Sequence, residues 1–187
     1  GVKFAGATPF WRAAYATDLD AMRLLVAWGA DPAIATRKVP SRRFGRRGND
    51  EDKSGLPPVP TGGPGVYPIH AASGVGYGEG FAANQHSHAP DSWLAAVRYL
   101  VEEHGADVNA RDLNGYSAVH HAASRGDNEL IEYLVQHGAD VSVVSRRGET
   151  TVDMANGPRQ RVQPFPATIA LLESLGAVNN HNCQSCE

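Results

Sequence analysis

The sequence predicts an all-α repeat fold, a solenoid in which short helix-turn-helix units stack side by side. The phrase Gly-Ala-Asp recurs along the chain, complete in three copies and as Gly-Ala in a fourth, at residues 29–31, 105–107, 138–140 and 176–177. A glycine also opens each unit, and those of the third and fourth units, Gly115 and Gly148, stand 33 residues apart. A period of this length is typical of solenoids, whose units bury their apolar faces against their neighbours.

The units follow one another along nearly the whole chain. We predict a repeat domain over residues 1–178 and a tail over 179–187. Within the domain we expect one long inserted loop, at 33–64, and four repeats, at about 6–32, 65–109, 115–142 and 148–178.

Local signals mark where the helices begin and end. In the first repeat, Thr8 is expected to cap a helix whose first residue is Pro9, because proline lacks an N–H that would be unpaired there anyway. In the third repeat, Asp127 is expected to cap the second helix and Gly138 to end it in the left-handed conformation. Between them lies an apolar stripe at helical spacing that we predict to be core: Leu130, Ile131, Leu134 and Val135.

The opening phrases Thr8-Pro-Phe-Trp-Arg-Ala-Ala and Tyr67-Pro-Ile-His-Ala-Ala-Ser resemble the Thr-Pro-Leu-His-x-Ala signature of the ankyrin repeat. The resemblance implies an ankyrin-repeat solenoid and a non-enzymatic interaction or scaffold module. Such a module binds a protein partner, or joins a larger assembly, through its concave surface and inserted loops. The resemblance also implies that His70 and His120 hydrogen-bond to backbone in a neighbouring turn and so tie the repeats together.

In this family, specificity resides in exposed turn residues. We therefore expect the partner to contact the turn before the third repeat, at Arg111, Asp112, Leu113, Asn114 and Tyr116. His121 follows the structural His120, and we expect it on the exposed side of its helix, where it could touch a ligand.

The inserted loop carries the strongest local charge of the chain. Its first part holds six basic residues and no acid, at Arg37, Lys38, Arg42, Arg43, Arg46 and Arg47. These side chains could dock a phosphate or an acidic partner, or they could be a solvated surface that Asp50-Glu51-Asp52 partly neutralises. Because prolines crowd residues 57–60 and no apolar period is present, we expect an irregular, extended segment that contacts something other than its own core. Shorter insertions interrupt the second and fourth repeats.

Both cysteines of the chain lie in the tail, as Cys183 and Cys186, shortly after His181. Their spacing is compatible with a redox dithiol, part of a zinc site, a local disulfide or a haem attachment. Glu187 stands where the haem motif needs histidine, and a zinc site would need a further ligand, so a local disulfide or two thiols is favoured. A redox-, haem- or metal-linked accessory protein is the alternative function.

Bacterial ankyrin-repeat proteins carry a tail similar to this one, which leads us to expect a bacterial protein. The compartment stays open, and an extracytoplasmic location is the one that we favour.

Composition excludes several other classes. The chain has 17 basic and 20 acidic residues, a balance that argues against a nucleic-acid binder. No apolar run approaches the roughly 20 residues that cross a bilayer, so membrane insertion is not expected. No catalytic arrangement of Ser, Cys, His or paired carboxylates is evident, so we expect neither an enzyme nor a cofactor.

The first repeat is unusually apolar for the end of a solenoid, where a polar outer face is normal. We expect that a neighbouring unit once preceded it. Phe4, Phe10 and Trp11 should then be covered by a partner chain or lie partly exposed.

Overall fold

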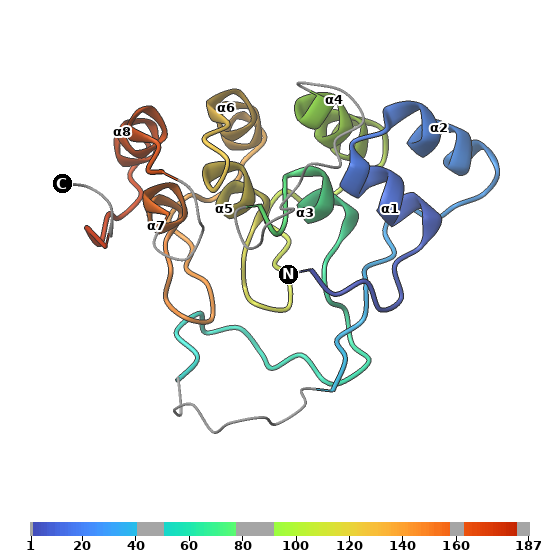
Figure 1. Ribbon diagram of the computed structural model, residues 1–187, viewed down its shortest axis with the longest axis horizontal. Coiled ribbons are helices and arrows are strands. Elements are labelled where there is room, and N and C mark those ends of the chain that lie inside the picture. The colour runs from blue at the N-terminus through green and yellow to red at the C-terminus, as the bar shows by residue number, and fades with distance from the viewer. Residues whose placement is uncertain (1, 41–50, 78–91, 158–162, 183–187) are drawn as a thin grey trace.

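The helices of the computed structural model lie in pairs that stack in a single row (Figure 1). The structure describes residues 2–40, 51–77, 92–157 and 163–182. The first helices of the pairs form an inner row: α1 (Pro9–Ala16), α3 (Pro68–Ala72), α5 (Ala118–Ala123) and α7 (Thr151–Asn156). The second helices form an outer row: α2 (Leu19–Ala27), α4 (Ser92–Arg98) continued by η1 (Tyr99–Glu103), α6 (Asn128–Gln136) and α8 (Pro166–Ser174). Apart from one isolated bridge, the described residues form no strand, and the predicted all-α repeat fold is confirmed.

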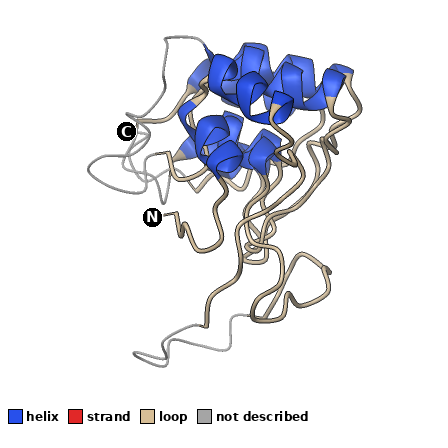
Figure 2. Cartoon of the chain, turned by 90° about the vertical axis from the view of Figure 1, so that its right-hand side faces the viewer, coloured by secondary structure: helices blue, strands red, loops and turns tan. Residues whose placement is uncertain are grey.

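Three loops, called fingers here, connect the outer helix of one pair to the inner helix of the next. They comprise residues 30–66 (first finger), 106–116 (second finger) and 139–149 (third finger). Figure 2 shows the helices in two layers and the fingers extending away from them. The first finger contains the predicted insertion, and two backbone bonds close its base, from Thr36 N to Val66 O and from Lys38 N to Gly63 O, both at 2.9 Å.

The predicted helix caps are confirmed. The Thr8 hydroxyl accepts from the N–H of Trp11 at 3.0 Å, and Pro9 is the first residue of α1. The Asp127 carboxylate accepts from the N–H of Leu130, also at 3.0 Å, at the start of α6. Gly138 follows α6 with a φ of 88°, the left-handed conformation that a side chain would oppose.

The outer helix of the second pair differs from the others by one inserted residue. Gly105 stands five positions after Leu100, whereas Gly138 stands four positions after Leu134. The extra residue is taken up by the π-helical turn η1, a common way to absorb a single insertion without breaking a helix. The backbone bond that closes the helix accordingly spans six residues, from Ala106 N to Leu100 O at 2.9 Å. Leu100 therefore stays buried.

The core runs continuously between the two rows of helices. Leu130, Ile131 and Leu134 of α6 are fully buried and Val135 packs against the core, as the stripe predicts. Small residues fill the inner row, where Ala122 and Ala123 have no exposed surface, so the two rows can approach closely. Each helix pair thus completes its core with its neighbours.

The prediction for the aromatic residues of the first repeat is partly wrong. Phe10 and Trp11 are fully buried within the chain itself, because α1 packs directly against α3. Phe4 alone fits the expectation, since 40% of its surface is exposed while its ring contacts Trp11 edge-on. The apolar surface of this repeat lies instead at Leu24 and Trp28, which are 60% and 84% exposed.

Truncation of the core at Leu134 tests this packing. We expect Leu134→Ala to lower the free energy of unfolding by about 2–5 kcal/mol, the range for a buried leucine. Glu132→Ala, at an exposed position of the same helix, should change it by less than about 0.5 kcal/mol. Denaturant titrations of both variants measure the difference, and similar losses would contradict the assigned buried face of α6.

Candidate protein-binding site

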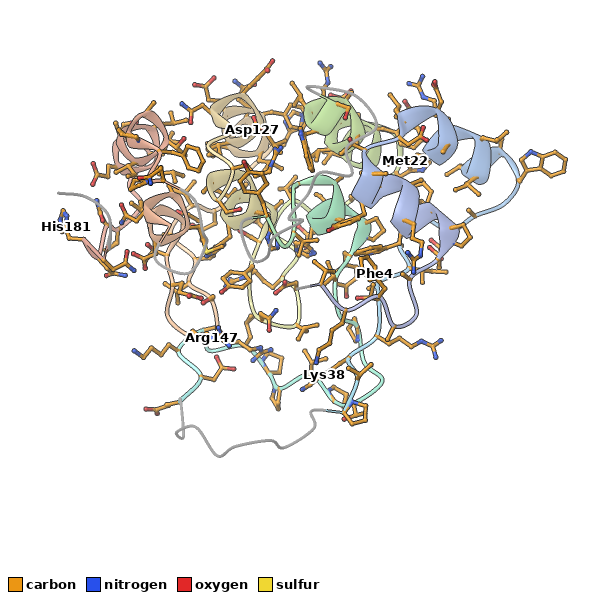
Figure 3. The ribbon with its side chains drawn as sticks, in the orientation of Figure 1. Phe4, Met22, Lys38, Asp127, Arg147 and His181 are labelled. Atoms are coloured by element: carbon orange, nitrogen blue, oxygen red, sulfur yellow. The ribbon has the colours of Figure 1, made fainter. Side chains whose placement is uncertain are left out.

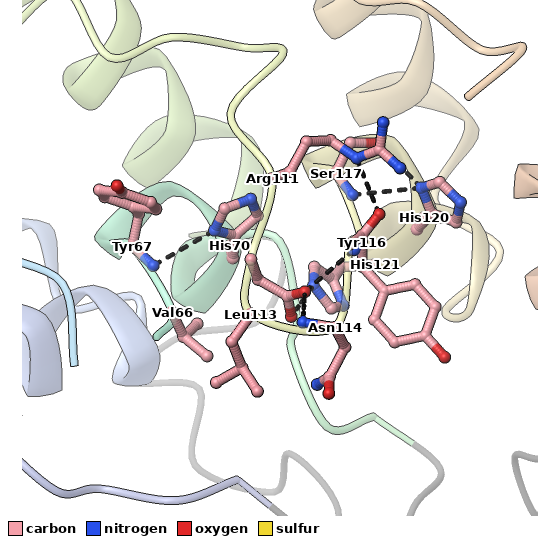
Figure 4. Close-up of polar contacts among 12 residues, drawn as sticks. Val66, Tyr67, His70, Arg111, Leu113, Asn114, Tyr116, Ser117, His120 and His121 are labelled. Atoms are coloured by element: carbon pink, nitrogen blue, oxygen red, sulfur yellow. Dashed lines mark hydrogen bonds and ion pairs between the residues drawn. The ribbon is translucent and has the colours of Figure 1, made fainter. Parts of the chain in front are cut away.

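Buried imidazoles hold the second and third fingers in place. The Nδ1 atoms of His70 and His120 accept the backbone N–H of Tyr67 and Ser117, each at 3.2 Å (Figure 4). The Nε2 atoms then face backbone carbonyls, Ala110 O at 2.9 Å for His70 and Glu149 O at 3.2 Å for His120. The predicted contact with a neighbouring turn is confirmed for both histidines.

Trp11 performs the same task in the first repeat, where it stands at the histidine position of the phrase. Its indole N–H donates to Val66 O at 2.8 Å. Val66 follows Gly65 just as Glu149 follows Gly148, so the ring of Trp11 reaches the equivalent point of its finger.

Burial keeps both imidazoles neutral. It lowers the pKa of His70 to about 4 and that of His120 to about 3, against an ordinary value of 6.5, although the Asp112 charge raises the pKa of His70 and the Glu149 carbonyl raises that of His120. At neutral pH each ring therefore has one donor and one acceptor, and both are used. These two histidines are structural.

The predicted contact residues converge on a hollow of about 220 Å³ beneath the second finger. Besides three valines and Lys3, it is lined by Asp112, Leu113, Asn114, Tyr116 and His121. Among its lining residues, Asn114 and Lys3 are exposed and Leu113 is half-buried. Val2, Val66 and Val75 contribute apolar wall.

Three of these predicted residues, Asp112, Tyr116 and His121, are buried, against the expectation. Asp112 and His121 are each only 3% exposed. The ring of His121 lies beside that of His70 on the neighbouring inner helix (Figure 4). One carboxylate oxygen of Asp112 accepts the N–H groups of Asn114 and Tyr116, at 2.8 and 2.9 Å, and so shapes the finger. The prediction that His121 is exposed is wrong.

The second carboxylate oxygen of Asp112 lies 3.7 Å from Nε2 of His121, and neither atom has a hydrogen-bond partner among the described residues. Burial raises the pKa of Asp112, but His121, His70 and the Tyr116 N–H together lower it overall, so the carboxyl group is ionised. The rings of His70 and His121 meet edge to face at 5.7 Å. The hollow thus presents a buried anion and an imidazole side by side.

Arg111 and Tyr116 are used within the chain, which corrects the expectation that they are exposed contact residues. The Arg111 guanidinium donates to Gly115 O at 2.7 Å and to Val144 O in the third finger. The Tyr116 hydroxyl donates to the Glu149 carboxylate, and the ring is 8% exposed. Both side chains join the second finger to the third.

A residue that the sequence analysis did not single out lies at the end of this array. Arg146, in the third finger, donates from its backbone to Asn114 O at 2.9 Å and from its side chain to Leu113 O at 3.0 Å. Its guanidinium also pairs with Asp52 of the inserted loop. A signal was present, since Asp52–Gly55 repeats the Asp-x-x-Gly pattern of Asp112–Gly115.

The remaining predicted sites lie at the edges of the described chain. Arg42, Arg43, Arg46 and Arg47 lie outside the described residues, as do Cys183 and Cys186, and their roles stay predictions. His181 is exposed and lies beside α7 (Figure 3). Over residues 2–40, 51–77, 92–157 and 163–182, no three His, Cys, Asp or Glu side chains are grouped to hold a metal ion. In the same ranges no helix has the length and apolar character to cross a membrane.

Comparison with known proteins agrees with this architecture. Residues 65–113 match the family model described as "Ankyrin repeat", and residues 95–155 match the one described as "Ankyrin repeats (many copies)". BCL-6 corepressor-like protein 1 from Mus musculus is 45% identical over 56 residues, which are 30% of this chain and 3% of that protein. Ankyrin repeat and SAM domain-containing protein 6 from Rattus norvegicus is 39% identical over 62 residues, 33% of this chain and 7% of that protein.

A third relative is closer in size. Ankyrin repeat-containing protein P1E11.10 from Schizosaccharomyces pombe is 35% identical over 69 residues, 33% of this chain and 32% of that protein. The chain therefore spans no more than about a third of the length of any of these three relatives. All three are eukaryotic, and the bacterial origin expected from the tail stays a prediction.

Acid is expected to destabilise the fold through the two neutral histidines. His70 and His120 protonate near pH 6.5 when unfolded but only near pH 4 and 3 when folded, so the unfolded state binds more protons in between. Stability is then fully present above pH 6.5 and falls as the pH decreases, by up to about 1.4 kcal/mol per pH unit for each ring. Denaturant titrations across this range measure the slope. His120→Gln, which cannot titrate, should give a shallower slope, and an unchanged slope would contradict the assignment.

Proposed function

The chain belongs to the ankyrin-repeat family, and on this premise we propose that it is a protein-recognition module whose partner binds over the second finger. Ankyrin repeats are generally protein-interaction modules and are typically non-enzymatic. The observation that carries the proposal is the hollow beneath this finger, where Asp112 and His121 hold two buried polar atoms that have no hydrogen-bond partner among the described residues.

Such atoms favour a ligand that completes their hydrogen bonds. A buried polar atom left without a partner costs about 1–3 kcal/mol, so a group that bonds to both atoms gains part of that free energy. The Asp112 carboxylate accepts only, whereas Nε2 of His121 can donate or accept. With 3.7 Å between these atoms, a single amide or hydroxyl group can contact both.

The surroundings restrict what enters. A volume of about 220 Å³ has room for one side chain, and the valines on its wall favour one with an apolar stem. Asn114 and Leu113 would then contact the partner's backbone beside that side chain. We therefore expect a partner that inserts one polar-tipped side chain, such as glutamine or threonine, beneath the second finger.

Site-specific photo-crosslinking tests the location of this surface. A photoreactive amino acid at position 114 should capture the partner in an extract of the native source. The same amino acid at position 132, an exposed site on outer helix α6, should not capture it. Capture from position 132 alone, or from both positions equally, would contradict the proposed surface.

A second variant tests the hollow itself. His121→Leu keeps a side chain of similar bulk but removes Nε2, and we expect it to reduce capture from position 114 at least about tenfold. The thermal unfolding of this variant, followed by circular dichroism, serves as the control for folding. Undiminished capture by a folded His121→Leu chain would mean that the partner does not use the hollow.

A further inference from the structure

Neighbouring fingers contact each other through backbone bonds that are donated from the same turn position. Leu113 of the second finger donates its N–H to Gly65 O of the first, and Arg146 of the third donates to Asn114 O of the second, both at 2.9 Å. Leu113 and Arg146 occupy the same place in their turns, since each stands two residues before the glycine that ends the turn. Among the described residues no fourth finger follows, which would leave the outer face of the third finger uncovered.

Part of the inserted loop covers that face instead. Lys53 donates its N–H to Arg146 O at 3.0 Å, which adds a third bond donated from this turn position. The close approach also recurs, because a Cβ on Gly148 would lie 2.6 Å from the Lys53 side chain, and one on Gly115 would lie 2.9 Å from Arg146. Figure 1 shows this part of the loop, in cyan, passing from the third finger back along the finger ends to the first.

The covering segment shares several features with a finger turn. Asp52–Gly55 and Asp112–Gly115 share the pattern Asp-x-x-Gly. In both, the aspartate Oδ1 accepts the N–H two residues later, at 2.9 Å in the first and 2.8 Å in the second. In both, the final glycine is left-handed, with φ values of 68° and 82°. Residues 52–55 therefore stand where the turn of a fourth finger would dock.

The side chain of Arg146 binds this segment. The guanidinium pairs with the Asp52 carboxylate and donates to Leu56 O at 3.2 Å and to Pro57 O at 2.7 Å. Hydrogen bonds from Ser54 and the pairing with Arg146 lower the pKa of Asp52 to about 2, so the pair is charged at neutral pH. Asp52 and Lys53 nevertheless remain exposed to solvent. This exposure is compatible with a segment that can detach from the third finger.

We propose that the outer face of the third finger is a docking surface for an Asp-x-x-Gly turn, which residues 52–57 occupy within the chain. The external partner that fits this surface is a finger turn of another ankyrin-type repeat unit, which displaces residues 52–57 and pairs its own aspartate with Arg146. This inference rests on the proposed function, because it specifies the kind of protein that binds to the fingers. It assigns the inserted loop the role of an internal competitor.

A nuclear magnetic resonance titration tests the docking surface. The protein is the full chain with residues 51–58 replaced by alternating glycine and serine, and the probe is a synthetic peptide with the sequence of residues 51–60. We expect amide shifts at Arg146, Arg147 and Gly148 that saturate with peptide. The unmodified chain should respond far more weakly, because its own segment competes at the high effective concentration of a short tether.

Two peptide variants separate recognition of the turn from simple charge attraction. Asp52→Ala removes the pairing with Arg146, and Gly55→Ala keeps all charges but opposes the left-handed turn. Each should bind at least about tenfold more weakly than the original peptide. Equal binding of the Gly55→Ala peptide, or absence of shifts on a folded replaced chain, would overturn the proposal.

A single substitution covers the case in which the replaced chain fails to fold. Asp52→Ala in the full chain changes one surface residue, and this variant should bind the peptide at least about tenfold more tightly than the unmodified chain does. Equal binding by the two chains would overturn the proposal. Crosslinking from position 114 reports on the second finger alone, so its success beside a failed titration would leave the proposed function standing and remove only this docking surface.

Discussion

A ring nitrogen buried in each of the first three repeats fixes the position of a finger. Trp11, His70 and His120 each direct an N–H at a backbone carbonyl of the following loop, at distances of 2.8 to 3.2 Å. The three ring side chains have no exposed surface, so water competes little for these bonds. Because each bond joins one helix pair to the loop beyond it, the spacing of the fingers follows from the spacing of the inner helices. The hollow and the docking face both depend on that spacing.

Much of the fold could be predicted from the sequence because its determinants are local. The caps at Thr8 and Asp127 and the stripe on α6 need only the residues within one or two turns of a helix. The family phrase adds the roles of His70 and His120. The π-helical turn was not predicted, although the extra residue before Gly105 is evident when the second and third repeats are aligned.

The candidate site was less predictable because its burial arises between fingers. Asp112 and Tyr116 have the composition of an exposed turn, yet the first turns its carboxylate inward and the second reaches Glu149 of the next finger. Neither contact can be inferred from the turn alone. The position of Asp52 depends on a loop that crosses from the first finger to the third, and no local pattern specifies that path.

The contact of the inserted loop with Arg146 changes how the solenoid folds as a whole. Repeat proteins ordinarily fold by nearest-neighbour steps, with contacts that are short in sequence. Here the paired atoms of Arg146 and residues 52–57 are separated by about 90 positions in the chain. Closing so long a loop is slow. Its entropy cost is smaller once the intervening repeats are ordered, so we expect this contact to form late in folding. The chain thereby gains a long-range cooperative link. Unfolding at one end of the array therefore destabilises repeats that do not contact that end.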